Sequence, residues 1–285
     1  MTAPITTYDI AVGDHHFRVA EAGPSTGRPV LFLHGSGPGV TALTNWEWLI
    51  GELGDEFRCI APDVLGFGDS SHPNPPPQGL GAFTRLRVET LVGLLDELGI
   101  DEVTLVGNSM GGIISAAMTL DVPERVRALV LMGTGGAPVG LTPGLVQLIT
   151  FYDEPTAANM ASLLSQFVHD PAHFGDDLQS IAEARMPRAM LPEVERSHRA
   201  TFGPGDGVGF TAERIATITQ PALVVHGDDD RIVPIASGEW FAEHLPNARF
   251  EVFPETGHWL QIEQGPAFAA LLRDFLAETS EGTVG

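Results

Sequence analysis

Hydrophobic and polar positions alternate in the first segment of the chain, and short apolar runs separated by helical spacing follow. Residues 7–12 and 16–22 alternate as strands do, and Gly13-Asp14 between them predicts a β-hairpin. The later apolar runs predict strands buried on both faces, at 29–34, 57–62, 103–107 and 126–132. Between these runs, apolar residues recur at helical intervals, which predicts helices at 43–53, 86–98 and 110–120. This alternation predicts a parallel sheet with right-handed crossovers.

The alternation stops after Met132. Residues 133–208 are rich in Pro, Met, Phe and His and have helical but no strand periodicity, which predicts a helical insertion. Strand patterns return at 221–226 and 248–253, and an amphipathic helix is predicted at 268–277. We therefore predict one α/β core domain, formed by 1–137 and 210–285, with a helical lid inserted after the sixth strand at 138–209. The glycine-rich stretch 203–209 is a hinge candidate.

Composition and charge narrow the classes of function. The 285 residues are 43% hydrophobic, enough for a large closed core, and 37 acidic residues against 15 basic ones give a net charge of −22. Such a surface repels phosphate backbones and anionic membranes, so we expect neither a nucleic-acid nor a membrane partner. Cys59 is the single cysteine, so no internal disulfide can form. The chain starts without a basic and apolar leader and has no run of about 18 apolar residues, which favours a cytoplasmic protein.

The sharpest chemical signal is Gly107-Asn108-Ser109-Met110-Gly111, a G-x-S-x-G between a strand and a helix. A serine at such a tight turn takes a strained backbone conformation, which requires small residues two positions before and after it. We predict that Ser109 is a nucleophile and that the N–H of Met110, at the start of the helix, stabilises an oxyanion. The alternative is a glycine-rich helix start with no catalytic role.

A catalytic serine needs a base and an orienting carboxylate. His258 follows the predicted strand 248–253, and Asp230 follows the strand 221–226. Both lie past carboxyl ends of strands, where α/β folds assemble their sites, so we predict His258 as the base and Asp230 as its carboxylate. Asp228 and Asp229 are competitors for that role. A calcium site formed by the three aspartates is a weaker alternative, because they crowd one short loop.

A second oxyanion donor is predicted in the glycine-rich segment His34-Gly35-Ser36-Gly37-Pro38-Gly39, which follows the third predicted strand. The backbone of such a loop can approach a ligand closely. We predict the N–H of Ser36 as the partner of Met110, with that of Gly37 as the alternative. The loop could also be only a turn, and it lacks the G-K-[ST] of a phosphate-binding loop.

Taken together, these segments resemble the α/β-hydrolase superfamily and, within it, the meta-cleavage product hydrolases. That family breaks a carbon–carbon bond in 2-hydroxy-6-oxohexa-2,4-dienoates formed during the degradation of aromatic compounds. The more specific segments are residues 33–39 with Asn45 downstream, Gly107-Asn-Ser-Met-Gly-Gly112, Leu131-Met-Gly-Thr-Gly-Gly136 and Gly257-His-Trp259. The resemblance covers nearly the whole chain and implies an α/β-hydrolase fold.

The resemblance also implies how the substrate is held. Asn45, Asn108 and Trp259, with Gly37 beside them, would line a polar subsite for the carboxylate and enol end of the substrate. An arginine of the lid would complete this subsite. Arg185 fits the family's pattern best and Arg188 is the alternative. A guanidinium suits this task because it donates two parallel hydrogen bonds to a carboxylate.

By the same resemblance, the dienol first becomes its keto tautomer, and Ser109 then attacks the C6 ketone or helps water to do so. The substrate supplies its own electron sink, so no metal or organic cofactor is implied, and a homodimer or higher homo-oligomer is expected. A carboxylesterase or lactonase with the same triad is the alternative enzyme, and a non-catalytic binding protein is the alternative of another class. Haloalkane dehalogenases and epoxide hydrolases are disfavoured because they carry an aspartate where Ser109 stands.

Overall fold

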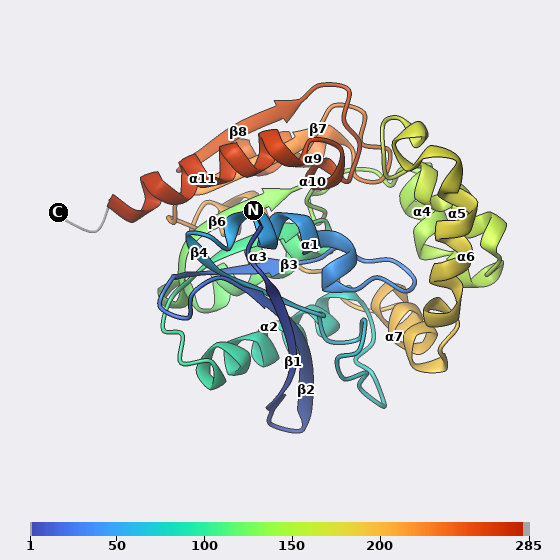
Figure 1. Cartoon of the computed structure of the whole chain (residues 1–285), viewed down its shortest axis with the longest axis horizontal. Helices are drawn as coiled ribbons and strands as arrows, with labels where there is room; N and C mark the ends of the chain where they lie inside the picture. Colours follow the sequence, from blue (N-terminus) through green and yellow to red (C-terminus); the bar gives the residue numbers. More distant parts are fainter. Residues whose placement is uncertain (1, 282–285) are drawn as a thin grey trace.

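An eight-stranded sheet forms the centre of the computed structural model, which describes residues 2–281 (Figure 1). The strand order is β1-β2-β4-β3-β5-β6-β7-β8; β1 with β2 and β2 with β4 are antiparallel, and the other neighbours are parallel. The strands are β1 (Ile5–Val12), β2 (His15–Ala22), β3 (Arg28–Leu33), β4 (Phe57–Pro62), β5 (Val103–Asn108), β6 (Val126–Met132), β7 (Ala222–Gly227) and β8 (Ala248–Phe253). The predicted mostly parallel α/β sheet is confirmed.

Helices cover both faces of the sheet because the buried strands present apolar side chains on both sides. One face packs against α2 (Leu80–Glu97), α3 (Met110–Asp121), α8 (Ala212–Ile215) and α9 (Ile235–His244). The other face packs against α1 (Ala42–Leu53) and α11 (Gly265–Glu281), with α10 (Leu260–Glu263) just before α11. A 3-10 turn, Pro123–Arg125, precedes β6. The two apolar clusters make this the three-layer arrangement of an α/β domain.

One helix begins earlier than its apolar spacing predicts. We predicted 86–98, whereas α2 starts at Leu80. Gly79 precedes it at φ 84°, and a Cβ there would meet Gly205 Cα at 2.7 Å. The N–H of Gly79 also donates to Ala200 O. Contacts with the end of the helical insertion therefore determine where α2 starts, and the local pattern does not contain them.

The segment between β6 and β7 is helical, with its own apolar cluster. Its helices are α4 (Pro143–Ile149), α5 (Ala157–Ser165), α6 (Leu178–Ala189) and α7 (Pro192–Phe202), with 3-10 turns at Phe151–Asp153 and Pro171–Asp177. Figure 1 shows them together beside the end of the sheet to which β7 and β8 point. Their cluster also includes Ile232, Val233 and Trp259 of the core. That this helical insertion, 138–209, acts as a lid stays a prediction.

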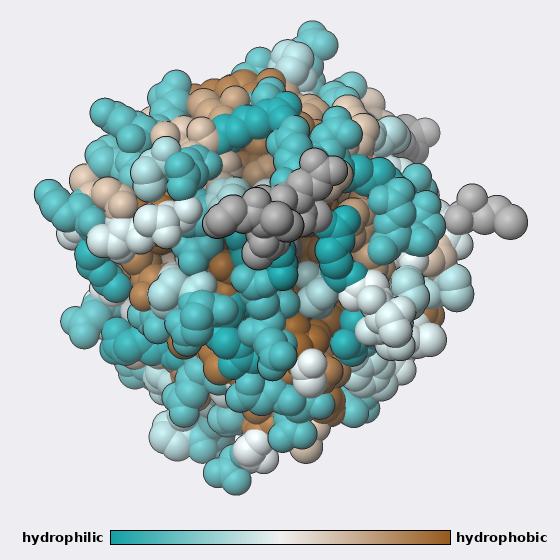
Figure 2. All heavy atoms as spheres, turned by 90° about the vertical axis from the view of Figure 1, so that its left-hand side faces the viewer, coloured by the Kyte–Doolittle hydropathy of each residue, from teal (hydrophilic) through white to brown (hydrophobic). Residues whose placement is uncertain are grey.

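The face opposite the helical insertion is mostly hydrophilic, with smaller apolar areas (Figure 2). This agrees with the strongly acidic composition. Within residues 2–281, no helix has the length and apolar character that crossing a bilayer requires.

Candidate active site

Ser109 stands at a sharp turn between β5 and α3. Its backbone has φ 56° and ψ −114°, a conformation that a residue with a side chain adopts only under strain. A Cβ on Gly107 would lie 2.4 Å from Gly111 O, and a Cβ on Gly111 would lie 1.9 Å from Leu33 O. Only glycine fits at either position, as the sequence argument requires. The turn leaves the N–H of Met110, the first of α3, without an intrahelical acceptor.

Asp230 and His258 meet past the ends of β7 and β8. His258 Nδ1 lies 2.6 Å from Asp230 Oδ2, and both side chains are buried. The N–H groups of Ile232 and Val233 each donate to Asp230 Oδ1 at 2.8 Å. Burial acts to raise the pKa of Asp230, but the electrostatic interaction with His258 and the hydrogen bonds from His226 and His258 hold this pKa well below its ordinary value. Asp230 is therefore an anion suited to orient an imidazole.

The competing aspartates face other partners. Asp229 Oδ2 lies 2.5 Å from Arg231 Nη2 and 2.9 Å from His169 Nδ1. Asp228 accepts the N–H of Thr256 at 3.4 Å. Of the three adjacent aspartates, the structure brings Asp230 to His258.

The second ring nitrogen of His258, Nε2, makes no hydrogen bond to Ser109. His258 Nε2 is buried and has no hydrogen-bond partner among the described residues. Its ring packs edge-on against Phe167 of the helical insertion, with centroids 5.4 Å apart. Hydrogen bonds between a nucleophile and its base are often long without substrate. The missing hydrogen bond at Nε2 therefore does not argue against His258 as the base for Ser109.

A second histidine contacts the same carboxylate, and our sequence reasoning missed it. His226 Nε2 lies 3.3 Å from Asp230 Oδ2 and 2.9 Å from Val233 O, and its side chain is fully buried. Because a carbonyl oxygen can only accept, Nε2 carries the proton and points it toward both oxygens. The spacing of four residues from Asp230, on the strand that leads to it, is the signal that could have found His226.

The glycine-rich loop after β3 lies against the nucleophile. A Cβ on Gly35 would be 3.2 Å from Ser109 Cβ and 3.0 Å from Asn108 Oδ1. Ser36, the predicted second oxyanion donor, is 9% exposed and follows Gly35 directly in this loop. His34 anchors the loop, because its Nε2 accepts the N–H of Val64 at 2.9 Å. Burial lowers the pKa of His34 to about 4, so it is neutral.

Two asparagines connect α1 to the nucleophile turn. Asn45 Nδ2 donates to Asn108 Oδ1 at 3.2 Å, and both residues are buried. Asn108 Nδ2 donates in turn to Met132 O at 3.3 Å and to His258 O at 3.5 Å. The predicted subsite residues Asn45 and Asn108 are thus in contact and lie beside the triad candidates.

Arg185 and Arg188 take different positions on α6. Arg185 Nε donates to Pro38 O at 2.8 Å, and its Nη2 would be 3.5 Å from a Cβ on Gly37. Arg188 instead pairs with Asp69, with nitrogen–oxygen distances of 2.5 and 3.2 Å. Among the described residues Arg185 has no ion pair, and burial lowers its pKa to about 10. The unpaired guanidinium therefore belongs to Arg185.

A cavity of about 540 Å³ lies between the helical insertion and the core. Arg185, Trp259 and Gly39 line it together with Leu164, Phe174 and Ile181. Trp259 is 8% exposed and packs on Phe167, with ring centroids 4.5 Å apart. The lining combines the guanidinium groups of Arg185 and Arg188 and the indole of Trp259 with apolar side chains, a chemistry that suits an anion with an apolar body.

A buried arginine links the core to the helical insertion close to the turn that carries Ser109, and sequence reasoning missed it too. Arg87 of α2 is fully buried, with Nη2 2.9 Å from Thr201 Oγ1 and Nη1 3.4 Å from Met110 Sδ. Its guanidinium carbon lies 3.9 Å from the centroid of Phe83. Burial lowers the pKa of Arg87 to about 9. We find no sequence pattern that singles this residue out.

Comparisons with known proteins agree with this geometry. The family model described as the alpha/beta hydrolase fold matches residues 28–264. The 2-hydroxymuconate semialdehyde hydrolase of Pseudomonas sp. (strain CF600) is 38% identical over 263 residues, covering 90% of each chain. The 2-hydroxy-6-oxo-6-phenylhexa-2,4-dienoate hydrolase of Rhodococcus sp. strain RHA1 superposes with a TM-score of 0.92 at 32% identity, over 97% of this chain and 100% of that one.

A third relative extends the comparison. A meta-cleavage product hydrolase from Pseudomonas fluorescens IP01 superposes with a TM-score of 0.87 at 32% identity, covering 95% of this chain and 97% of that one. Relatives at this identity, matched over nearly their whole length, share the fold and the order of its elements. This chain therefore belongs to the α/β-hydrolase fold family and, within it, to the meta-cleavage product hydrolases.

Proposed function

We propose that the chain hydrolyses a carbon–carbon bond in 2-hydroxy-6-oxohexa-2,4-dienoates, giving 2-hydroxypenta-2,4-dienoate and a carboxylic acid. The observation that carries the proposal is the unpaired guanidinium of Arg185, held against the glycine-rich loop that contacts Ser109. A carboxylate bound there brings a dienoate to the nucleophile in one orientation. The names of the relatives support the same substrate class.

Binding precedes chemistry in this proposal. Arg185 donates two parallel hydrogen bonds to the substrate carboxylate, and Asn45, Asn108 and Trp259 hold the enol end. The apolar lining contributed by the helical insertion accommodates the C6 substituent. In the keto tautomer, the carbon chain that will depart can accept an electron pair as a dienolate, so the substrate itself provides the electron sink.

The triad then acts on the C6 ketone. His258 accepts the proton of whichever nucleophile adds to C6: that of the Ser109 hydroxyl, or that of a water which Ser109 helps to place. Asp230, which accepts from His258 Nδ1, holds the imidazole in the tautomer with Nε2 free and stabilises its protonated form. The N–H groups of Met110 and Ser36 donate to the oxyanion.

Cleavage follows from collapse of this adduct. The bond between C5 and C6 breaks, its electron pair leaves with the dienolate, and protonation gives the dienoic acid. Where Ser109 is the nucleophile, collapse leaves an ester between Ser109 and C6, which a water hydrolyses with His258 as the base; where water adds, the carboxylic acid forms directly. In both routes the hydroxyl of one water ends on C6, so the sum is substrate plus one water.

We also propose that the protein works in the cytoplasm as a homodimer or higher homo-oligomer. The single, buried Cys59 suits a reducing compartment. The edge strand β8, where Val252 is 42% exposed, offers a surface for pairing two copies. Light scattering of the purified protein tests the oligomeric state.

The experiment that tests the reaction follows the loss of dienolate absorbance for substrates bearing methyl, isopropyl or phenyl at C6. We expect Ser109-dependent turnover of at least one, with feeble turnover of a p-nitrophenyl ester. Arg185→Met should raise KM, whereas Arg199→Met, a control that removes an exposed ion-paired arginine of α7, should not. Efficient ester turnover with inert dienoates would make the chain a carboxylesterase or lactonase instead.

A further inference from the structure

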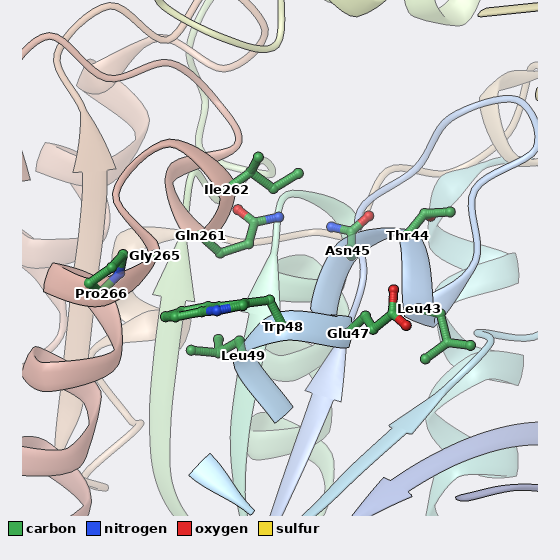
Figure 3. Close-up of a pocket in the computed structure, with 10 residues that line it drawn as sticks. All are labelled: Leu43, Thr44, Asn45, Glu47, Trp48, Leu49, Gln261, Ile262, Gly265 and Pro266. Atoms are coloured by element: carbon green, nitrogen blue, oxygen red, sulfur yellow. The ribbon is translucent and has the colours of Figure 1, made fainter. Parts of the chain in front are cut away.

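A second pocket lies outside the catalytic groups, between α1 and α10. We call it the α1–α10 pocket. It has a volume of about 410 Å³ and is lined mainly by apolar and amide side chains from these helices and from the start of α11 (Figure 3). Ser109 and His258 are absent from its lining, whereas Asn45, a predicted substrate-subsite residue, lies at its edge nearest Gln261. Its size is within the range of small-molecule sites.

The feature that points to a ligand is the side chain of Gln261. This residue of α10 is 3% exposed, yet neither Oε1 nor Nε2 has a hydrogen-bond partner among the described residues. In Figure 3 its carboxamide points into the space between α10 and α1, toward Asn45. A buried amide without partners costs free energy, and a bound group that supplies one donor and one acceptor removes that cost.

Trp48 provides a flat wall beside this amide. The residue is 43% exposed, and in Figure 3 its indole lies lengthwise between α1 and the turn at Gly265. A Cβ on Gly265 would be 2.9 Å from Trp48 Cζ3, so the missing side chain lets the ring lie against the backbone there. Leu49 also lines the pocket. An exposed indole is a platform on which a planar ligand stacks.

The charges around the pocket exclude most ionic ligands. Glu47 is the one charged residue in the lining, and no Arg or His is present. A carboxylate ligand would offer only acceptors, would leave Oε1 of Gln261 unpaired and would meet Glu47. An ammonium ligand would offer only donors and would leave Nε2 unpaired. Both amide atoms are satisfied by an edge that places an N–H beside a C=O.

We propose that the α1–α10 pocket binds small, planar, uncharged molecules with a carboxamide or lactam edge. The edge pairs with the carboxamide of Gln261 through two parallel hydrogen bonds, and the ring stacks on Trp48. This assignment is independent of the proposed reaction, because binding is measured without turnover.

The test uses benzamide as the probe and benzoate as its anionic counterpart, with binding followed by ligand-observed NMR and tryptophan fluorescence. We expect saturable benzamide binding with a Kd on the order of 1 mM, as for a ligand of this size, and benzoate binding weaker by about 10-fold or more. Gln261→Leu should weaken benzamide binding by about 10-fold or more without lowering Tm, since it removes an unpaired buried amide. Trp48→Leu should also weaken binding.

Gln264→Leu is the matched control, because Gln264 ends α10, is half-buried and does not line the pocket. It should bind benzamide as the wild type does. Should Gln261→Leu fail to fold, Gln261→Glu, which retains the size and loses the donor, replaces it. Equal affinity for benzamide and benzoate, or undiminished benzamide binding by the Gln261 and Trp48 variants, would overturn the proposal.

Discussion

Replacing His226 with phenylalanine should loosen Asp230 and slow catalysis without removing any proposed triad member. The ring of phenylalanine fills similar space, but the N–H that lies 3.3 Å from Asp230 Oδ2 and 2.9 Å from Val233 O is lost. Asp230 Oδ2 then retains His258 as its side-chain donor among the described residues. We therefore regard His226 as a positioning residue.

The magnitude follows from the hydrogen bonds removed. A hydrogen bond to a buried charged group contributes about 1.5–3 kcal/mol, and the 3.3 Å separation favours the lower end, so we expect a loss of about 1–2 kcal/mol. In a chain of this length that corresponds to a fall in Tm of about 2–8 °C. A loosened carboxylate orients His258 less well, so kcat should fall by about 3- to 30-fold, corresponding to about 0.7–2 kcal/mol at the transition state.

The pH dependence separates this role from a purely structural one. The folded pKa of Asp230 lies below its unfolded value, so its carboxylate contributes stability above the unfolded pKa, and that stability is lost as pH falls through the folded pKa. His226→Phe removes a group that lowers this pKa. The fall in stability at low pH, which we call the acid limb of the stability profile, should therefore occur at higher pH in this variant.

The assay combines thermal unfolding with the dienolate absorbance assay across pH. His226→Gln, which can restore an N–H donor, should recover part of kcat. His198→Phe is the matched control, because His198 is also buried and its Nε2 bonds Ile149 O, but among the described residues it forms no hydrogen bond or ion pair with a carboxylate. It should lose stability and keep the wild-type acid limb. If His226→Phe behaves as the His198 variant does, with kcat and the acid limb unchanged, the reasoning is refuted.

Three further predictions concern the neighbourhood of the site. Arg188→Met removes the partly exposed ion pair between the helical insertion and the core, so the free energy of unfolding should fall by less than about 1 kcal/mol and should depend less on salt. Thermal unfolding at low and high NaCl checks this. Gly111→Ala places a Cβ against Leu33 O, so kcat should fall by about 100-fold or more in a folded protein, as activity and circular dichroism measure. Arg87→Met loses the hydrogen bond to Thr201 and should cost about 1–3 kcal/mol in urea unfolding; an unchanged midpoint would contradict it.

The nucleophile turn illustrates what can be read locally. The glycines at 107 and 111 flank Ser109 within five residues, and a Cβ on Gly107 would clash with Gly111 inside that segment, although the clash at Gly111 is with Leu33 of β3. The strand and helix periods around it are likewise local, because they depend on which side of an element each residue faces. The fold class and the position of the candidate nucleophile could therefore be predicted without coordinates.

Partners that are distant in sequence could not be predicted in the same way. The choice of Asp230 over Asp228 and Asp229 depends on how the turn after β7 aims three adjacent side chains. Arg185 and Arg188 are also neighbours on α6, and only the packing of α6 against the core pairs Arg188 with Asp69.

The division between the two kinds of information has a physical cause. By itself the sequence determined the elements and the fold family and left three adjacent aspartates as candidates for the carboxylate of the triad, because backbone periodicity and turn chemistry act over a few residues. Only the tertiary structure decided the role of His226 beside Asp230, the burial of Arg87 and the unpaired amide of Gln261. Hydrogen-bond partners and burial depend on distances between elements, and those distances exist only once the sheet and its helices have packed.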